Sequence, residues 1–215
     1  MLRLAVAPSG RRAPVAIVTG WAAPLPDSAT ERLALPADGG KGPLMRRWIR
    51  EQRRLGRAYQ PRFRLRQVGI TALGALIALA LMGLLSLWSG QVLIVAPLGA
   101  SCVLLFGYPA SPLAQPRNLL IGNGLGALVG VLLQHLLGQG PLVLALAVAL
   151  TILLGQQLRC LHPPAGGMAF LAVFLGVPWG FLLFPVLVGS LLLVLLAWAF
   201  SRWVPGAMPY PRHWL

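Results

Sequence analysis

The stretch RCLHPPAGGMAFLAVF, residues 159–174, places an arginine, a histidine and two prolines at the start of an apolar run. Adjacent prolines cannot lie inside a helix, and an ionisable ring is costly in lipid. His162 can donate a hydrogen bond to an anion, or it can titrate and link the movement of a ligand to protons. The alternative is an interfacial histidine that caps the preceding helix end beside Arg159. The sequence leaves these interpretations open.

A second polar cluster lies in YPASPLAQPRNLLIGNG, residues 108–124, where three prolines stiffen a short loop and Gln115, Arg117 and Asn118 open the next helix. In one interpretation this is a turn, with Asn118 near the helix start and Arg117 as a topology anchor. In the other, Arg117 and Arg159 lie on the same side of a membrane and form a vestibule for anions. Anchoring explains a single arginine but not the surrounding polar residues.

Small residues recur every fourth position in the segment that follows, at Gly122, Gly126 and Gly130. This spacing predicts a groove on one helix face that allows close packing with another helix. Asn123 lies one step off this face and needs interior partners, either as part of a pathway or as a bridge between helices.

Two short segments resemble each other, APLGASCVLLFGYP from Ala96 and PPAGGMAFLAVFLGVP from Pro163. Proline suits the first turn of a helix, and glycine lets a ligand approach the backbone. Two opposed helices that begin within a membrane would therefore make a neutral-to-positive hollow that suits a small anion, with the Ser101 hydroxyl beside it. The aligned pairs are Pro97 with Pro164, Gly99 with Gly166, and Ala100 with Gly167.

The composition predicts an integral membrane protein. Hydrophobic residues make up 57% of the 215 residues and charged residues only 10%, too few to cover a soluble domain of this size. All four acids and fourteen of the eighteen basic residues precede residue 67. The net charge of +14 is therefore interpreted as a topology signal and a contact with anionic lipid headgroups rather than with nucleic acid.

The chain divides into four parts. Residues 1–44 are rich in Pro, Gly and Ala and are expected to be disordered and dispensable. Residues 45–66 form a basic interfacial segment, with Trp48, Ile49 and Leu55 toward lipid. A transmembrane domain covers 67–203, with halves 67–137 and 141–203, and a short tail covers 204–215.

The fold class is all-α, with six apolar stretches in two inverted three-helix repeats. Two stretches are short and broken by Pro and Gly, and they could instead be re-entrant. If all six cross, every arginine beyond residue 66 falls on the cytoplasmic side, together with both termini. This distribution favours six crossings. The stretches are 67–88, 92–107, 118–137, 141–158, 161–176 and 181–203.

The segment VAPLGASCVLLFGYPASPLAQPRNLLIGNGLGALVG together with LHPPAGGMAF resembles the HPP family of integral membrane proteins over residues 62–203. The family is usually described with four membrane spans, whereas the arginine distribution favours six. Plant chloroplast and cyanobacterial members are associated with nitrite transport, so the resemblance implies a small-anion transporter or channel. Carried over by motif, the residues of interest are His162, Pro163, Pro164, Gly166, Gly167, Pro97, Gly99, Ala100, Ser101, Gln115, Pro116, Arg117 and Asn118, to which Asn123 and Arg159 are added from their own positions.

The functional expectation is passive or proton-linked passage of a small anion, with nitrite as the first candidate, through the bacterial inner membrane. No catalytic constellation, cofactor motif or metal-ligand spacing is present, so no enzyme and no cofactor are expected. A homo-oligomer is compatible with the sequence. The rival is a membrane scaffold or sensor subunit without a path. A path requires a polar-lined hollow between the two proline-broken helices, whereas a scaffold is packed shut there.

Overall fold

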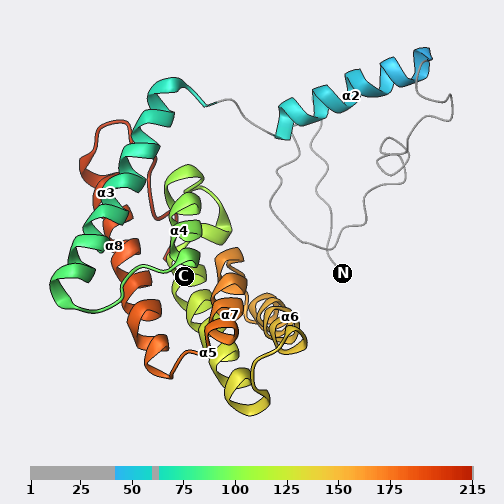
Figure 1. Ribbon diagram of the computed structural model, residues 1–215. Helices are drawn as coiled ribbons and strands as arrows, with labels where there is room; N and C mark the ends of the chain where they lie inside the picture. Colours follow the sequence, from blue (N-terminus) through green and yellow to red (C-terminus); the bar gives the residue numbers. More distant parts are fainter. Residues whose placement is uncertain (1–41, 60–62, 215) are drawn as a thin grey trace, which may run out of the picture. The chain divides into compact units, whose positions relative to one another are not determined.

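The computed structural model describes residues 42–59 and 63–214, which belong to two units, 1–62 and 63–215. Every regular element in these described ranges is a helix (Figure 1). The disorder expected over residues 1–44 falls mostly on residues 1–41, which lie outside the described residues. Pro43 and Leu44, at the end of that range, belong instead to the first turn of a helix.

The first unit contains one described helix, α2 (Pro43–Tyr59). Met45 and Trp48 are half-buried, whereas Arg46, Arg47 and Arg50 are exposed. Residues three apart lie on one face of a helix, so the arginines next to them point elsewhere. This two-faced pattern is typical of a helix at a membrane surface.

The second unit contains the six apolar stretches as six helical segments. Each segment coincides with one predicted stretch. The elements are α3 (Leu65–Ser89), α4 (Ala96–Cys102) continued by the π-helix η1 (Val103–Gly107), the short 3₁₀ helix η2 (Pro112–Ala114), α5 (Pro116–Leu137), α6 (Pro141–Gln157), α7 (Pro163–Leu175), and the π-helix η3 (Leu182–Leu187) continued by α8 (Val188–Trp203).

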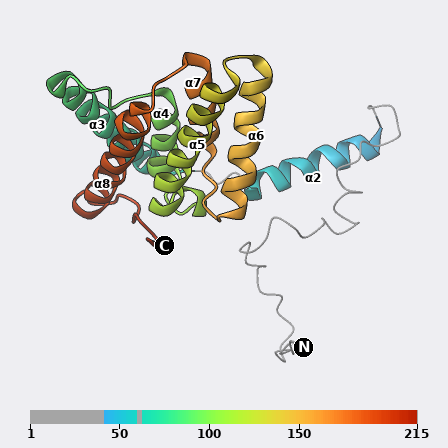
Figure 2. The ribbon, with the colours of Figure 1, turned by 90° about the horizontal axis from the view of Figure 1, so that it is seen from below.

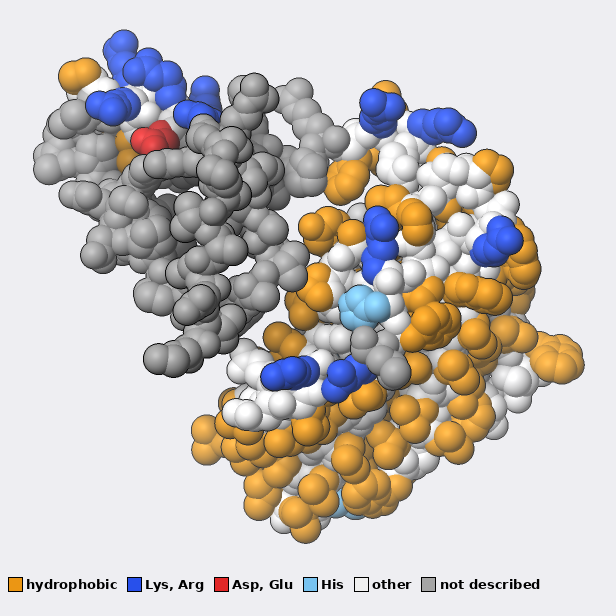
Figure 3. All heavy atoms as spheres, turned by 180° about the vertical axis from the view of Figure 1, so that it is seen from behind, with side chains coloured by type: hydrophobic (Ala, Val, Ile, Leu, Met, Phe, Trp, Pro, Cys, Tyr) orange, Lys and Arg blue, Asp and Glu red, His pale blue; other side chains and the backbone are white. Residues whose placement is uncertain are grey.

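Three of these segments are long and apolar enough to cross a membrane: Leu65–Ser89, Pro116–Leu137 and Leu182–Trp203. The three shorter ones are Ala96–Gly107, Pro141–Gln157 and Pro163–Leu175. Large hydrophobic side chains lie exposed along all of them, and Figure 3 shows a visible surface that is mostly apolar. Such a surface is stable in lipid rather than in water.

Helices α5, α6 and α7 pack side by side (Figures 1 and 2). The glycines of α5 make this contact possible, as their spacing predicts. A Cβ added at Gly130 would lie 2.6 Å from the carbonyl oxygen of Ala169, and one added at Gly126 would overlap the carbonyl oxygen of Ala165. The partner numbers rise along both helices, so α5 and α7 run parallel.

The starts of α3 and α5, the end of α6 and the tail after α8 meet at one end of the second unit, and arginines lie on all four. Arg117, at the start of α5, donates to the Leu158 carbonyl at the end of α6 (3.2 Å). The tail after α8 reaches the same place, because the Arg212 amide donates to the Gln115 side chain (2.9 Å). The start of α3 also contacts this tail, through Arg66 and Gly206.

Candidate functional site

His162 directly precedes α7, and its side chain is only 2% exposed. Ring nitrogen Nδ1 lies 2.8 Å from the carbonyl oxygen of Leu113, and Nε2 lies 2.8 Å from the hydroxyl of Ser101. The ring therefore bonds across the bundle to α4 and to η2, and not to the end of α6. The interpretation of His162 as a cap on the end of α6 is wrong.

Gly122 of α5 provides the space for this histidine. A Cβ at Gly122 would lie 2.7 Å from the Cβ of His162 and 2.8 Å from the carbonyl oxygen of Cys160. Because only a hydrogen fits there, the extended residues before α7 lie directly on α5. The glycine groove thus positions the histidine as well as packing two helices.

Asn123, next to Gly122, connects the histidine to the far side of the bundle. Its Nδ2 donates to Ser190 of α8 (3.1 Å) and, more weakly, to Ser101 (3.4 Å). All three side chains are 0% exposed. The oxygen Oδ1 of Asn123 is buried and has no hydrogen-bond partner among the described residues. We call His162, Ser101, Asn123 and Ser190 the polar line.

The two proline-broken helices lie side by side, as predicted. Gly167 approaches Pro97, since a Cβ there would lie 3.3 Å from the proline ring, and Ser101 bonds to His162. The numbers rise on one helix and fall on the other, so α4 and α7 run antiparallel. Their starts are therefore about one to two turns apart along the pair.

A hollow of about 670 Å³ lies between these helices, but its lining is apolar. The expectation of a polar-lined hollow at this place is wrong. The physical reason is the helical repeat, because Ala100 faces the hollow whereas Ser101, turned by about 100°, faces the polar line. The lining residues are Ala96, Pro97, Ala100, Leu104, Pro163, Pro164, Gly167, Phe170 and Leu171.

Arg117, Asn118 and Arg159 surround the segment that enters α7. Arg117 is half-buried on the Leu158 carbonyl, and Asn118 donates to the Leu161 carbonyl (2.9 Å). Arg159 is exposed and has a left-handed backbone (φ 54°) in the turn that ends α6. The structure thus brings both arginines to one end of the bundle, where a vestibule was predicted.

The Gln115 side chain bonds to backbone groups of a loop and of the tail, and so it is not free to line a path for a solute. Its Nε2 donates to the carbonyls of Pro109 (3.0 Å) and Ser111 (2.7 Å), and its Oε1 accepts from the tail amides of Arg212 and His213. The amide is therefore fully bonded to backbone groups. It holds the loop before α5 against the C-terminal tail.

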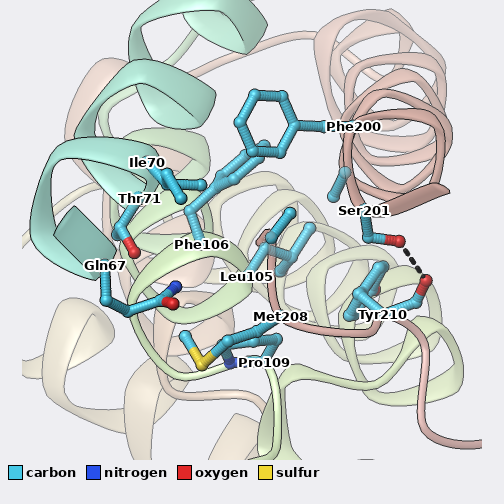
Figure 4. A pocket seen from close by; sticks show the side chains of 12 residues that line it. Gln67, Ile70, Thr71, Leu105, Phe106, Pro109, Phe200, Ser201, Met208 and Tyr210 are labelled. Atoms are coloured by element: carbon cyan, nitrogen blue, oxygen red, sulfur yellow. Dashed lines mark hydrogen bonds between the residues drawn. The ribbon is translucent and has the colours of Figure 1, made fainter. Parts of the chain in front are cut away.

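Tyr210 reinforces the same junction. Its hydroxyl donates to the Ala114 carbonyl (3.1 Å), and its own carbonyl accepts from the Ser201 hydroxyl (2.7 Å; Figure 4). Burial raises the pKa of Tyr210, so the hydroxyl keeps its proton and remains a donor. Beside it lies a cavity of about 20 Å³, lined in part by Gln67 and Met208, with room for one water molecule.

The remaining predicted residues divide by position. Pro163, Pro164, Gly167, Pro97 and Ala100 line the apolar hollow. Pro116 is buried in the first turn of α5, Gly166 faces Val148 of α6, and a Cβ at Gly99 would have no neighbour within 4 Å. None of these is in the polar line.

Sequence reasoning missed Ser190. The signal was available: Gly189 and Ser190 follow Gly122 and Asn123 by 67 residues, the spacing that separates Pro97 from Pro164. Extending the repeat into the last segment would have placed a second small polar residue opposite Asn123.

The apolar exterior, the spanning helices and the buried polar line together define a helical integral membrane protein. The chain belongs to the HPP family, because the family model described as "HPP, transmembrane region" matches residues 60–211.

Two relatives from Dictyostelium discoideum, both named only as transmembrane proteins, are similar to this chain. One is 34% identical over 163 residues, which cover 70% of this chain and 56% of the relative. The other is 33% identical over 162 residues, with 70% and 52% covered. The chain thus spans about half the length of these relatives. No solved structure matches it.

Proposed function

We propose that this chain lets small anions, nitrite first among them, pass through the bacterial inner membrane. The observation that carries the proposal is the polar line. Four fully buried polar side chains on four segments are joined by hydrogen bonds inside a unit whose exterior is apolar. Polar groups are costly inside a membrane and are commonly functional there. Neutral donors on a low-dielectric path suit an anion that must bind and leave.

The charge distribution supports an anion over a cation. No Asp or Glu follows Glu51 in the sequence, whereas Arg117 and Arg159 lie at one end of the bundle. A cation would have to rely on carbonyl and hydroxyl oxygens alone. Nitrite is named as the candidate because of the family resemblance.

We further propose that six segments cross the membrane as two inverted halves. Two matching contacts support this. A Cβ at Gly122 would lie 2.8 Å from the Cys160 carbonyl oxygen, and one at Gly189 would lie 2.8 Å from the Leu93 carbonyl oxygen. Both the two glycines and the two carbonyls are 67 residues apart. Each half thus rests a glycine on the extended segment of the other half, as expected of repeats related by a twofold axis.

The orientation of the protein in the membrane follows from the arginines at the end of the bundle where α5 starts. Arginines concentrate at cytoplasmic faces, so the starts of α3 and α5 and both termini are placed in the cytoplasm. The exposed arginines of α2 would then contact anionic lipid headgroups.

The proposal is tested by nitrite uptake into proteoliposomes that contain the purified protein. Uptake is expected to exceed that of protein-free vesicles, which set the baseline because nitrous acid crosses bilayers unaided. A vesicle preparation with an unrelated membrane protein controls for leaks at the protein–lipid boundary. Equal uptake in all three preparations would exclude nitrite passage.

Arg159→Gly is expected to separate stability from passage. Glycine adopts the left-handed conformation without strain, so the substitution should stabilise the protein by about 1 kcal/mol. Loss of the charge should slow nitrite uptake about threefold or more, because a positive vestibule concentrates anions. Thermal unfolding in detergent and vesicle uptake measure the two effects. Arg159→Lys, which keeps both strain and charge, should resemble the wild type. Unchanged nitrite uptake in Arg159→Gly would show that Arg159 does not attract anions and serves only to set the membrane topology.

A second candidate is a homo-oligomeric scaffold without a path. The apolar lining of the hollow between α4 and α7 favours it, because a helix of a second copy can fill an apolar groove with small residues and close it. Under this candidate the protein forms a stable oligomer in detergent and passes no nitrite.

A further inference from the structure

We propose that His162 takes up one proton for each anion that passes, so that the pair crosses without net charge. This inference rests on the proposed function and assigns its co-substrate, a proton. It is carried by the hydrogen bonds around the ring and by the charges that face it.

The first step is the position of the exchangeable proton. Nδ1 lies 2.8 Å from the Leu113 carbonyl oxygen, which can only accept, so Nδ1 must carry a hydrogen. Nε2 is therefore the nitrogen that gains or loses a proton. It faces the Ser101 hydroxyl, inside the polar line.

The second step is that both protonation states have complete hydrogen bonds. With a neutral ring, the Ser101 hydroxyl donates to Nε2. With a protonated ring, Nε2 donates to Ser101, and the hydroxyl hydrogen turns to the Pro97 carbonyl oxygen, 3.2 Å away. The proton comes from the solution and returns to it. Only a rotation of one hydroxyl is needed.

The third step is the charge around a protonated ring. From α4 it meets the Ser101 hydroxyl, from α5 Gly122, and from η2 the Leu113 carbonyl. The nearby titratable groups are the buried Cys160 thiol and the Tyr210 hydroxyl, and neither is a carboxylate that could balance the charge of the ring. The charged side chains that the structure describes at the same end are those of arginines.

Among residues 63–214, a protonated His162 thus has no fixed counter-charge, because no Asp or Glu occurs in this range. An unpaired buried charge is strongly unfavourable, so the state is stable only when an anion lies beside it. By linkage, the anion then favours proton uptake and the proton favours anion binding to the same extent.

The test uses the full chain in vesicles with a trapped pH dye and an inward gradient of sodium nitrite. In the wild type, nitrite uptake should acidify the lumen above the protein-free baseline, without a counter-ion shunt. The initial rate of nitrite uptake above the protein-free baseline should rise by up to about tenfold for each unit that the external pH falls, as one unsaturated proton site requires. In His162→Gln, the same rate should change by less than about twofold for each pH unit. His135→Gln, which changes an exposed histidine outside the polar line, should keep the wild-type response.

The outcomes separate the two proposals. If nitrite enters the wild-type vesicles but carries charge, so that uptake needs a potassium shunt and does not acidify the lumen, proton coupling is wrong and anion passage stands. If His162→Gln keeps the wild-type pH response, His162 is not the coupling group. If no nitrite enters above the baseline, both proposals fall. The wild-type proton-to-nitrite ratio decides the coupling even if His162→Gln does not fold, and Ser101→Ala gives a second variant that should weaken the pH response.

Discussion

Gly126→Ala is expected to prevent the membrane unit from assembling correctly. The added methyl would overlap the Ala165 carbonyl oxygen and lie 2.9 Å from its carbonyl carbon. Both atoms belong to the backbone of α7, so no side-chain rotation relieves the overlap. The two helices would have to separate along the contact that positions His162. Overpacking a tight interior commonly destabilises by about 1–3 kcal/mol, and a contact between two backbones belongs at the upper end.

Thermal stability and monodispersity in detergent measure this effect. The matched control is Gly69→Ala in α3, where an added Cβ has no neighbour within 4 Å. That substitution should leave stability unchanged or slightly improved, since alanine favours the helix. If Gly126→Ala matched Gly69→Ala in both measurements, the close contact between α5 and α7 would be wrong.

Periodicity and proline positions predicted the helices well. The stretch predicted over 92–107 begins as an extended segment and becomes helical only at Ala96, because Pro97 fits the first turn and stops the helix from extending backward. For the same reason the stretch predicted from residue 161 becomes helical at Pro163. The glycine spacing of α5 also predicted its packing face.

The direction of side chains on the short helices could not be predicted. Ala100 and Ser101 are neighbours in sequence, yet one faces the apolar hollow and the other the polar line. Both helices are apolar on nearly every face, so periodicity carries no signal about which face is buried. Only the packing against α5 and α8 decides it.

Gln115 shows a second limit. Its position beside Arg117 predicted a polar path, but its partners are backbone amides of the tail 97 and 98 residues further on. No local pattern reports such a contact. A glutamine that closes a loop and a glutamine that lines a path have the same sequence signature.

Asn123→Leu is expected to reduce nitrite uptake to the protein-free baseline, a loss of roughly 100-fold. Asn123 is the residue that bonds both Ser101 and Ser190, and its oxygen is the unpaired polar atom of the line. Leucine has a similar volume but removes the Nδ2 amide, whose two N–H hydrogens are the ones that can donate to an anion. Losing two hydrogen bonds to a charged solute, at about 1.5 kcal/mol or more each, accounts for this factor.

The comparison variant is Thr151→Val, which removes another buried polar group at similar volume. The Thr151 hydroxyl bonds only to the Ala147 carbonyl of its own helix α6 (2.8 Å) and does not join the polar line. Both variants should fold and remain monodisperse, and Thr151→Val should retain wild-type uptake. Because both substitutions replace a buried polar group by carbon, a difference in uptake can come only from membership in the line. Nitrite uptake that survives in folded Asn123→Leu would move the path away from Asn123, toward the apolar hollow between α4 and α7.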